Sequence, residues 1–372
     1  MGIMNVIVPI LAILLGITLL IAVHELGHFM MAKTMGIKVL RFSIGFGKPI
    51  WIKKTASGLQ IIVAAIPLGG YVKMLDEREG PVAADELSKA FNRQTLLKRA
   101  AVVLAGPITN FIFAFLIYWL CYTIGITQLK PIIGSITPNS IASQADLPIN
   151  ATLIKIDNSH VHNWAEVMMA LFNHVGSKQP LLVQATHADK QGLYQLKVND
   201  WTLDPLRPDP LQSLGIVPKL LSRAELETKA NIYLQLQRYP FSQAWVVAWQ
   251  KTYAYLKFNL LITYKLLTGT ISLKSLSGPI GIFNGLNLAV KQGLASYLQM
   301  LAILSITIGF INLLPLPGLD GGHLGFLLLE KLRAKPLSVA AEVLAFRLGM
   351  IVLAMLMVQA MTNDLLRLVN LV

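Results

Sequence analysis

Long apolar runs recur along the chain and alternate with polar segments. The first run, residues 6–23, carries no charge, and about 20 apolar residues suffice for a helix to cross a bilayer. The later runs have the same character. The pattern therefore predicts an α-helical polytopic membrane protein with about four transmembrane helices, contained in the segments 3–33, 95–126, 296–330 and 342–368.

The segment between the first two runs, residues 34–94, is polar and basic. Twelve Lys and Arg residues lie from Lys33 to Arg99, and short loops rich in these residues stay in the cytoplasm. Within the segment, β-branched and aromatic residues at 42–47 and 59–67 flank a Thr-Ala-Ser-Gly turn, which predicts a β-hairpin.

Two further segments separate the second run from the third. Residues 130–218 mix short β-branched runs with polar turns, which predicts an α+β domain outside the cytoplasm, with a helix over 164–174 and strands over 181–186 and 195–198. Residues 219–290 form an amphipathic tract that is rich in Trp and Tyr and interrupted by Lys. We expect this tract to form helices that lie on the outer membrane surface.

Composition agrees with a membrane protein. The chain has 372 residues, of which 54% are hydrophobic and 14% charged, and this is too apolar for an ordinary soluble domain. The net charge of +13 reflects basic cytoplasmic loops, so we expect the lipid bilayer as a partner and no nucleic acid. Cys121 is the single cysteine and can form no intrachain disulfide.

The first apolar run ends in the motif H-E-x-x-H, formed by His24, Glu25 and His28. A helix places residues i and i+4 on one face, so the two imidazoles can share one metal ion. Imidazole suits zinc, and Glu25 can take the proton of a water that the metal activates. Polar groups at this depth are costly unless they are used, which favours a metal site over a chance match.

The third apolar run offers a further ligand. Asp320 is the only carboxylate between Leu298 and Glu330, and it follows Pro315 and Pro317, which disrupt helical hydrogen bonding. Irregular backbone at membrane depth is tolerated only where it is buried in protein or lines a wet cavity. The sequence therefore predicts that Asp320 completes the ligand set.

Together, H-E-L-G-H and N-L-L-P-L-P-G-L-D-G-G resemble the paired motifs of the site-2 protease family of intramembrane zinc metalloproteases. The whole chain is similar to the bacterial type that cuts anti-sigma factors in the inner membrane. The resemblance implies one Zn²⁺ on His24, His28 and Asp320, with Glu25 as general base. It also implies a hairpin that re-enters the membrane beside the site, and substrate contacts from Asn312, Gly45, Phe46 and Gly47. The A-G-P-x-x-N motif that ends at Asn110 would belong to the family's second helix, packed on the first.

Residues 130–218 resemble a PDZ domain, although typical PDZ turn residues are replaced at Asp146, Ala151 and Ser159. The resembled bacterial type commonly has two such domains in tandem, whereas this chain has room for one. Whether its groove binds a peptide stays open.

These features predict an intramembrane endopeptidase in the bacterial inner membrane, with its site near the cytoplasmic side and its PDZ-like domain in the periplasm. The resemblance implies single-span membrane proteins as substrates, such as anti-sigma factors or signal-peptide remnants, and a role in the sigma-E stress response. One alternative is a non-catalytic PDZ adaptor, which would need no Glu25 beside a metal-binding His. A metal transporter is another alternative, but such proteins usually show repeated halves.

Overall fold

The computed structural model describes residues 4–199, 201–205 and 208–369, and the chain divides into two compact units. The first unit consists of the chain up to Cys121, Trp245–Leu256 and Ile280–Val358. The second consists of Tyr122–Ala244, Lys257–Pro279 and the residues from Gln359 onward.

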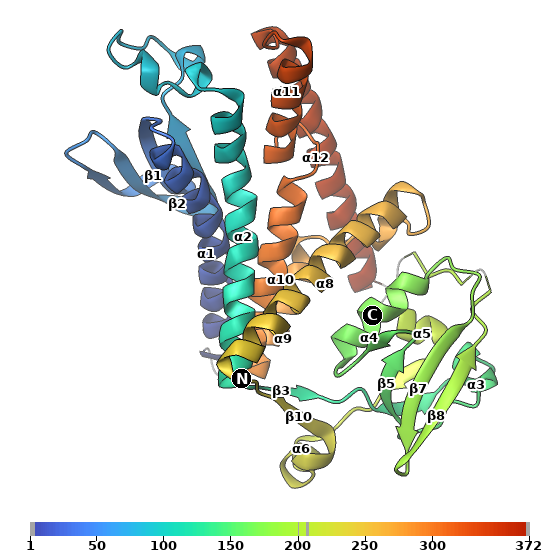
Figure 1. Ribbon diagram of the computed structural model, residues 1–372. Helices are drawn as coiled ribbons and strands as arrows, with labels where there is room; N and C mark the ends of the chain where they lie inside the picture. The colour runs from blue at the N-terminus through green and yellow to red at the C-terminus, as the bar shows by residue number, and fades with distance from the viewer. Residues whose placement is uncertain (1–3, 200, 206–207, 370–372) are drawn as a thin grey trace. The chain divides into compact units, whose positions relative to one another are not determined.

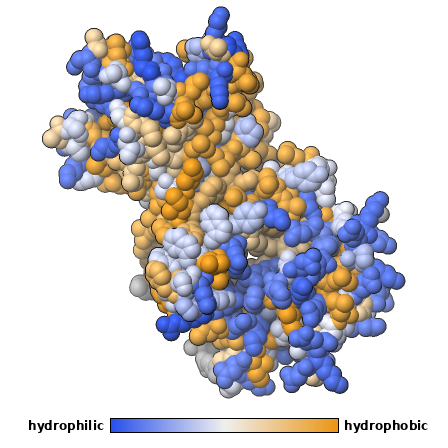
Figure 2. Space-filling model, viewed as in Figure 1, coloured by the Kyte–Doolittle hydropathy of each residue, from blue (hydrophilic) through white to orange (hydrophobic). Residues whose placement is uncertain are grey.

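Four helices among the described residues are long and apolar enough to cross a membrane, so the predicted polytopic class is confirmed. Large hydrophobic side chains on them are exposed, and Figure 2 shows such residues over much of the visible surface of the first unit's helices. Lipid can cover this surface. The four are α1 (Met4–Thr34), α2 (Leu96–Ile124), α10 (Leu294–Asn312) and α12 (Val339–Val369).

Small residues let α1, α2 and α10 pack closely (Figure 1). A Cβ atom added at Gly27 of α1 would lie 2.4 Å from the Ala105 carbonyl oxygen of α2. One added at Gly309 of α10 would lie 3.0 Å from the Pro107 carbonyl oxygen. Membrane helices associate through such close backbone approach, because lipid provides no hydrophobic drive between them.

The third predicted membrane segment, residues 296–330, is not one helix. Helix α10 ends at Asn312, an irregular stretch follows, and α11 (Asp320–Arg333) begins at the candidate metal ligand. Pro315 and Pro317 interrupt the helix because proline has no backbone N–H to donate. A Cβ atom at Gly321 would lie 2.2 Å from the Leu314 carbonyl oxygen, so the start of α11 folds tightly against this stretch.

The predicted hairpin is present as β1 (Val39–Lys54) and β2 (Gln60–Met74), both longer than the sequence indicated. Residues 41–44 have partners on both sides: 70–73 on one and 60–63 on the other. Residues 51–54 pair with the far side of 60–63. The hairpin thus has two outer segments, residues 70–74 and 49–54, and its first segment is internal.

Three short 3₁₀ helices follow the hairpin in the first unit: η1 (Glu77–Glu79), η2 (Leu87–Lys89) and η3 (Phe91–Arg93). Figure 2 shows hydrophilic residues gathered where these helices lie in the first unit.

The second unit holds a four-stranded sheet of order β6-β5-β7-β8, together with helix α4 (Trp164–His174). Buried Leu153, Leu171 and Leu196 pack the helix against the sheet. The predicted helix has the predicted bounds, whereas the strand expected over 195–198 begins earlier, at Lys190, and ends at Leu196. The strands are β5 (Thr152–Ile156), β6 (Ser159–His160), β7 (Leu181–His187) and β8 (Lys190–Leu196).

Shorter elements complete the second unit. Strand β3 pairs with β10, and β4 pairs with β9. The PDZ-like identity of this unit stays a prediction. The remaining bounds are β3 (Ile126–Leu129), β4 (Ile133–Ile136), β9 (Ile216–Pro218), β10 (Leu234–Gln237), α3 (Ile141–Gln144), α5 (Pro210–Leu214), α6 (Arg223–Thr228), α7 (Ala230–Tyr233) and η4 (Leu273–Ser275).

The amphipathic tract contains one long helix, α8 (Phe241–Leu267), and a shorter one, α9 (Pro279–Gln292). Within the first unit, the Trp245 ring of α8 lies 4.5 Å from the Phe115 ring of α2, centroid to centroid. Trp249 and Tyr253 are exposed on the same helix, as an interfacial role would require.

Candidate metal centre

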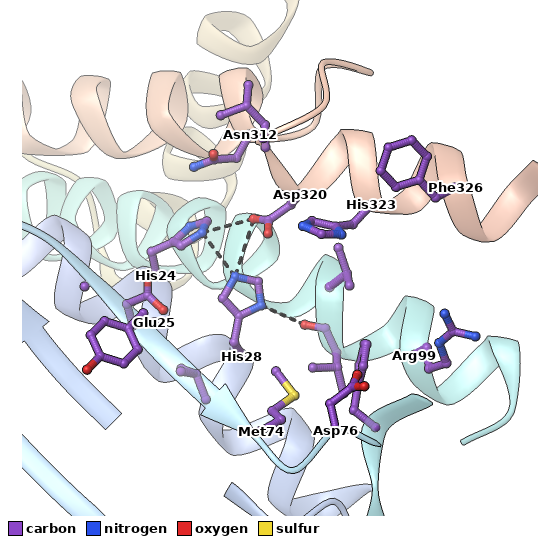
Figure 3. Close-up of a pocket in the computed structure, with 18 of the residues that line it drawn as sticks. His24, Glu25, His28, Met74, Asp76, Arg99, Asn312, Asp320, His323 and Phe326 are labelled. Atoms are coloured by element: carbon purple, nitrogen blue, oxygen red, sulfur yellow. Dashed lines mark hydrogen bonds and ion pairs between the residues drawn. The ribbon is translucent and has the colours of Figure 1, made fainter. Parts of the chain in front are cut away.

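His24 and His28 of α1 meet Asp320 at the first turn of α11 (Figure 3). The two Nε2 atoms are 3.2 Å apart, and both histidines are 8% exposed. Asp320 Oδ2 lies 3.1 Å from His24 Nε2 and 3.4 Å from His28 Nε2. The helical i, i+4 spacing thus brings the two imidazoles together, and the break after α10 brings the carboxylate to them.

These three atoms have the spacing that a zinc ion requires. Ligands on a tetrahedron with bonds of about 2.0–2.1 Å stand roughly 3.3 Å from one another. Asp320 Oδ2 is buried, and no described group hydrogen-bonds to it. A cation between the three atoms would satisfy this oxygen, so the donor set fits zinc.

Helix α2 contacts both histidines of the candidate centre. His28 Nδ1 lies 2.8 Å from the Val102 carbonyl oxygen, to which it donates, so the Nε2 lone pair is left for a metal. A Cβ atom at Gly106 would lie 2.3 Å from His28 Nε2, so only glycine lets α2 approach this closely. Asn110, buried in the same helix, lies 3.2 Å from His24 Nδ1 through its side-chain nitrogen.

Glu25 lies beside the centre without belonging to the ligand set. It lines the same cavity as His24 and His28. A Cβ atom at Gly70 of β2 would lie 2.9 Å from Glu25 Cγ, so the hairpin packs directly against this side chain. Figure 3 shows the Glu25 side chain beside His24, and Glu25 is not one of the three grouped side chains.

The cavity has a volume of about 770 Å³, and charged side chains line it together with apolar ones. Arg78 and Glu342 both line it, and their side chains are 3.1 Å apart. A hydrogen bond with Asp76 raises the pKa of the Arg78 guanidinium, so this group stays charged. Such a lining can hold water beside the three candidate ligands.

The structure brings together most of the predicted site residues. Asn312 and Phe46 line the cavity, but Gly45 and Gly47 do not. Gly69, Gly70 and Tyr71 of β2 line it in their place. Segment 70–74 is the outer segment of the hairpin on the cavity side, so β2 provides most of the hairpin residues that line the cavity.

Sequence reasoning also missed His323, Arg99 and Glu342, which line the cavity. His323 lies one helical turn after Asp320, so the i, i+3 spacing could have indicated it. Arg99 and Glu342 had no local signal, because they come from helices far apart in the sequence.

Comparison with known proteins gives one family and several close relatives. The pattern of Peptidase family M50 matches residues 12–356. Protease RseP of Yersinia pestis is 34% identical over 451 aligned positions, which cover 98% of this chain and 100% of that protein. Regulator of sigma-E protease RseP of Escherichia coli K12 is 33% identical and covers 94% of this chain and 96% of its own length. The putative zinc metalloprotease PM1991 of Pasteurella multocida is 35% identical, with 95% and 97% covered.

The alignment to the Yersinia protein has 451 positions, more than the 372 residues of this chain. That relative therefore has residues without a counterpart here, as the expectation of a single PDZ-like domain would require.

Proposed function

Since the chain belongs to peptidase family M50 and is a protease, we propose that it hydrolyses peptide bonds within the transmembrane segments of other membrane proteins. One observation carries the proposal: His24, His28 and Asp320 converge beside Glu25 in a charged cavity between apolar helices. A non-catalytic adaptor would need neither this ligand set nor Glu25, and it is not favoured.

Three side chains hold the metal in this proposal. His24 and His28 give their Nε2 atoms and Asp320 gives Oδ2 to one zinc ion per chain. When bound, zinc supplies Lewis-acid chemistry, because it polarises a substrate carbonyl and acidifies water. Catalytic zinc sites usually have three protein ligands, and two imidazoles and one carboxylate would provide that number here.

Glu25 and Asn312 act on the reacting groups. The Glu25 carboxylate accepts a proton from the attacking water and returns it to the nitrogen of the leaving amine. The Asn312 side-chain amide lines the cavity and donates an N–H to the substrate carbonyl as negative charge develops there. Donors of this kind count most in a site from which bulk water is excluded.

The substrate must be extended before it is cut. In a transmembrane helix every backbone group is bonded within the helix, which shields the scissile carbonyl. The outer hairpin segment 70–74 borders the cavity and, in the described part of the chain, pairs only with residues on its inner side. We assign this segment as the strand to which an unwound substrate adds, since an outer strand presents unpaired N–H and C=O groups.

Proline substitutions in this segment test the assignment. Successive N–H groups of a strand point to opposite edges, so Tyr71→Pro and Val72→Pro differ in which edge they affect. One of the two prolines falls where the N–H points to the outer edge. We expect that variant to keep its fold and to cleave a single-span substrate about tenfold more slowly, since one intermolecular hydrogen bond is lost and the ring obstructs the edge. Proline at Ile52, in the opposite outer segment, is the matched control and should cleave at the native rate. Native rates from both test variants would remove the assignment.

Metal removal tests the proposed function. The purified chain in liposomes should cut a single-span membrane protein that has Gly or Pro in mid-span, because these residues weaken its helix. A zinc chelator should stop cleavage, and added zinc should restore it. Cleavage that continues at full rate after chelation would show that the proposed metal chemistry is wrong.

We also propose an orientation. The basic segment 34–94 places the hairpin at the cytoplasmic side of the inner membrane, so the metal centre lies near that side and residues 130–218 lie in the periplasm. Single-span regulators such as anti-sigma factors would then be substrates, which fits the name of the Escherichia coli relative, Regulator of sigma-E protease RseP.

A further inference from the structure

Asn110 is the one polar side chain of α2 that reaches a candidate metal ligand. It is fully buried, and its side-chain nitrogen lies 3.2 Å from Nδ1 of His24. Its side-chain oxygen is also buried and has no hydrogen-bond partner among the described residues. A buried amide with one unpaired atom is costly and requires an explanation.

The chemistry of His24 decides which amide atom faces the ring. The Nε2 atom of His24 points at Asp320 Oδ2 and His28 Nε2, so Nε2 is the atom that would bind a metal. A neutral imidazole has one proton, and a metal-binding Nε2 must be without it. The proton is then on Nδ1, which becomes a donor and needs an acceptor.

An amide nitrogen cannot accept that hydrogen bond, but the amide oxygen can. Oxygen and nitrogen of an asparagine side chain have nearly the same shape, and the hydrogen-bond network decides their placement. With the amide turned by half a rotation, Oδ1 stands where Nδ2 now lies and receives Nδ1–H of His24. In either orientation one atom of the amide has no hydrogen-bond partner among the described residues. The need of His24 Nδ1–H for an acceptor therefore decides which amide atom faces the ring.

We propose that Asn110 is a positioning residue of the metal centre: its side-chain carbonyl accepts Nδ1–H of His24 and holds Nε2 unprotonated and aimed at the metal position. The proposal rests on the zinc site of the proposed function. His28 already has the equivalent support, because its Nδ1 donates to the Val102 carbonyl. Both ligands from α1 are therefore oriented by α2.

The backbone at Asn110 is itself fixed by a third helix. The Ser305 hydroxyl of α10 donates to the Asn110 main-chain oxygen at 2.8 Å, and Ser305 is fully buried. This contact joins α2 to α10 without touching His24. Ser305→Ala is thus a matched control, because it removes a buried hydrogen bond at the same residue and leaves the amide in place.

Three variants separate positioning from packing. Asn110→Leu keeps the size and loses the acceptor, so zinc affinity should fall about 10–100-fold, the usual effect of losing a residue that orients a ligand. Asn110→Asp keeps an oxygen acceptor and should stay within a few-fold of the native affinity, as should Ser305→Ala. Competition with a chelator gives the affinities, and thermal unfolding of the metal-free proteins shows whether each variant is folded. If Asn110→Leu does not accumulate, Asn110→Ala replaces it.

The visible spectrum of bound Co²⁺ adds a readout that packing alone would not change. It should shift in Asn110→Leu toward the spectrum of His24→Ala and stay native in Ser305→Ala. Native zinc affinity in Asn110→Leu would overturn the proposal, and so would an equal loss in Asn110→Asp or in Ser305→Ala. If His24→Ala itself binds zinc as tightly as the native chain, the assigned zinc site fails, and this is a different result from failure of the Asn110 proposal alone.

Discussion

A chain in which Glu25 is replaced by Gln should keep its zinc and lose peptide cleavage, by about 10²–10⁴-fold. The amide preserves the shape of the side chain that lines the cavity, but it cannot accept a proton from water. The metal ligands are not changed, so metal content should stay at one ion per chain. Cleavage of a single-span substrate and metal analysis of the same preparation measure the two effects together.

Zinc content and cleavage, measured together, distinguish a role of Glu25 as the base from a role in holding the metal. A variant that loses zinc as well as cleavage would mean that Glu25 supports the ligand set. Turnover at the native rate would exclude Glu25 as the base.

Replacement of both His24 and His28 by Ala should leave the purified protein without stoichiometric zinc. An open site has only three protein ligands, so two losses leave a single carboxylate, Asp320, to hold the ion. Cleavage should be lost with the metal. Metal analysis after dialysis against a weak chelator gives the zinc content.

His323→Ala is the control for this experiment. His323 lines the same cavity and lies one helical turn from Asp320, but it is not one of the three grouped ligands. The control should keep one zinc ion per chain. Zinc retained by the double variant, or lost equally by the control, would show that the ligand set has been assigned to the wrong residues.

The convergence of His24, His28 and Asp320 could be predicted from sequence because its signals are local. His24 and His28 lie one helical turn apart, and Asp320 is the only carboxylate in its apolar run. Helix periodicity and the cost of a charge at membrane depth therefore suffice to select them. The four membrane helices follow from run length for the same reason.

The remaining features depend on pairings between distant residues. The order of the hairpin segments follows from a register that joins residues 41–44 to two partners, and no local pattern shows that 70–74 is outermost. The turn between β7 and β8 has Ala188 and Asp189 at φ of 47° and 61°, a conformation that usually needs Gly or Asn. The start of β8 at Lys190 was therefore not visible in the sequence, whereas β7 ends one residue beyond the strand expected over 181–186. The pairing of β3 with β10 likewise joins strands more than a hundred residues apart.

The orientation of Asn110 toward His24 was also beyond the sequence. A buried polar residue in a membrane helix more often bonds a neighbouring helix, and Asn110 does so through its main chain. Two facts that only the structure provides motivate the positioning role proposed above: the side-chain nitrogen lies 3.2 Å from His24 Nδ1, and the side-chain oxygen is buried without a partner among the described residues.

The position of the cut in a substrate tests the proposed function most directly. A single-span substrate is incubated in liposomes with the native chain or with Glu25→Gln, and mass spectrometry maps the new ends. The account predicts new ends within the transmembrane segment, in the half nearer the cytoplasmic side, from the native chain only. Cuts confined to residues outside the span, or the same ends from both chains, would contradict it.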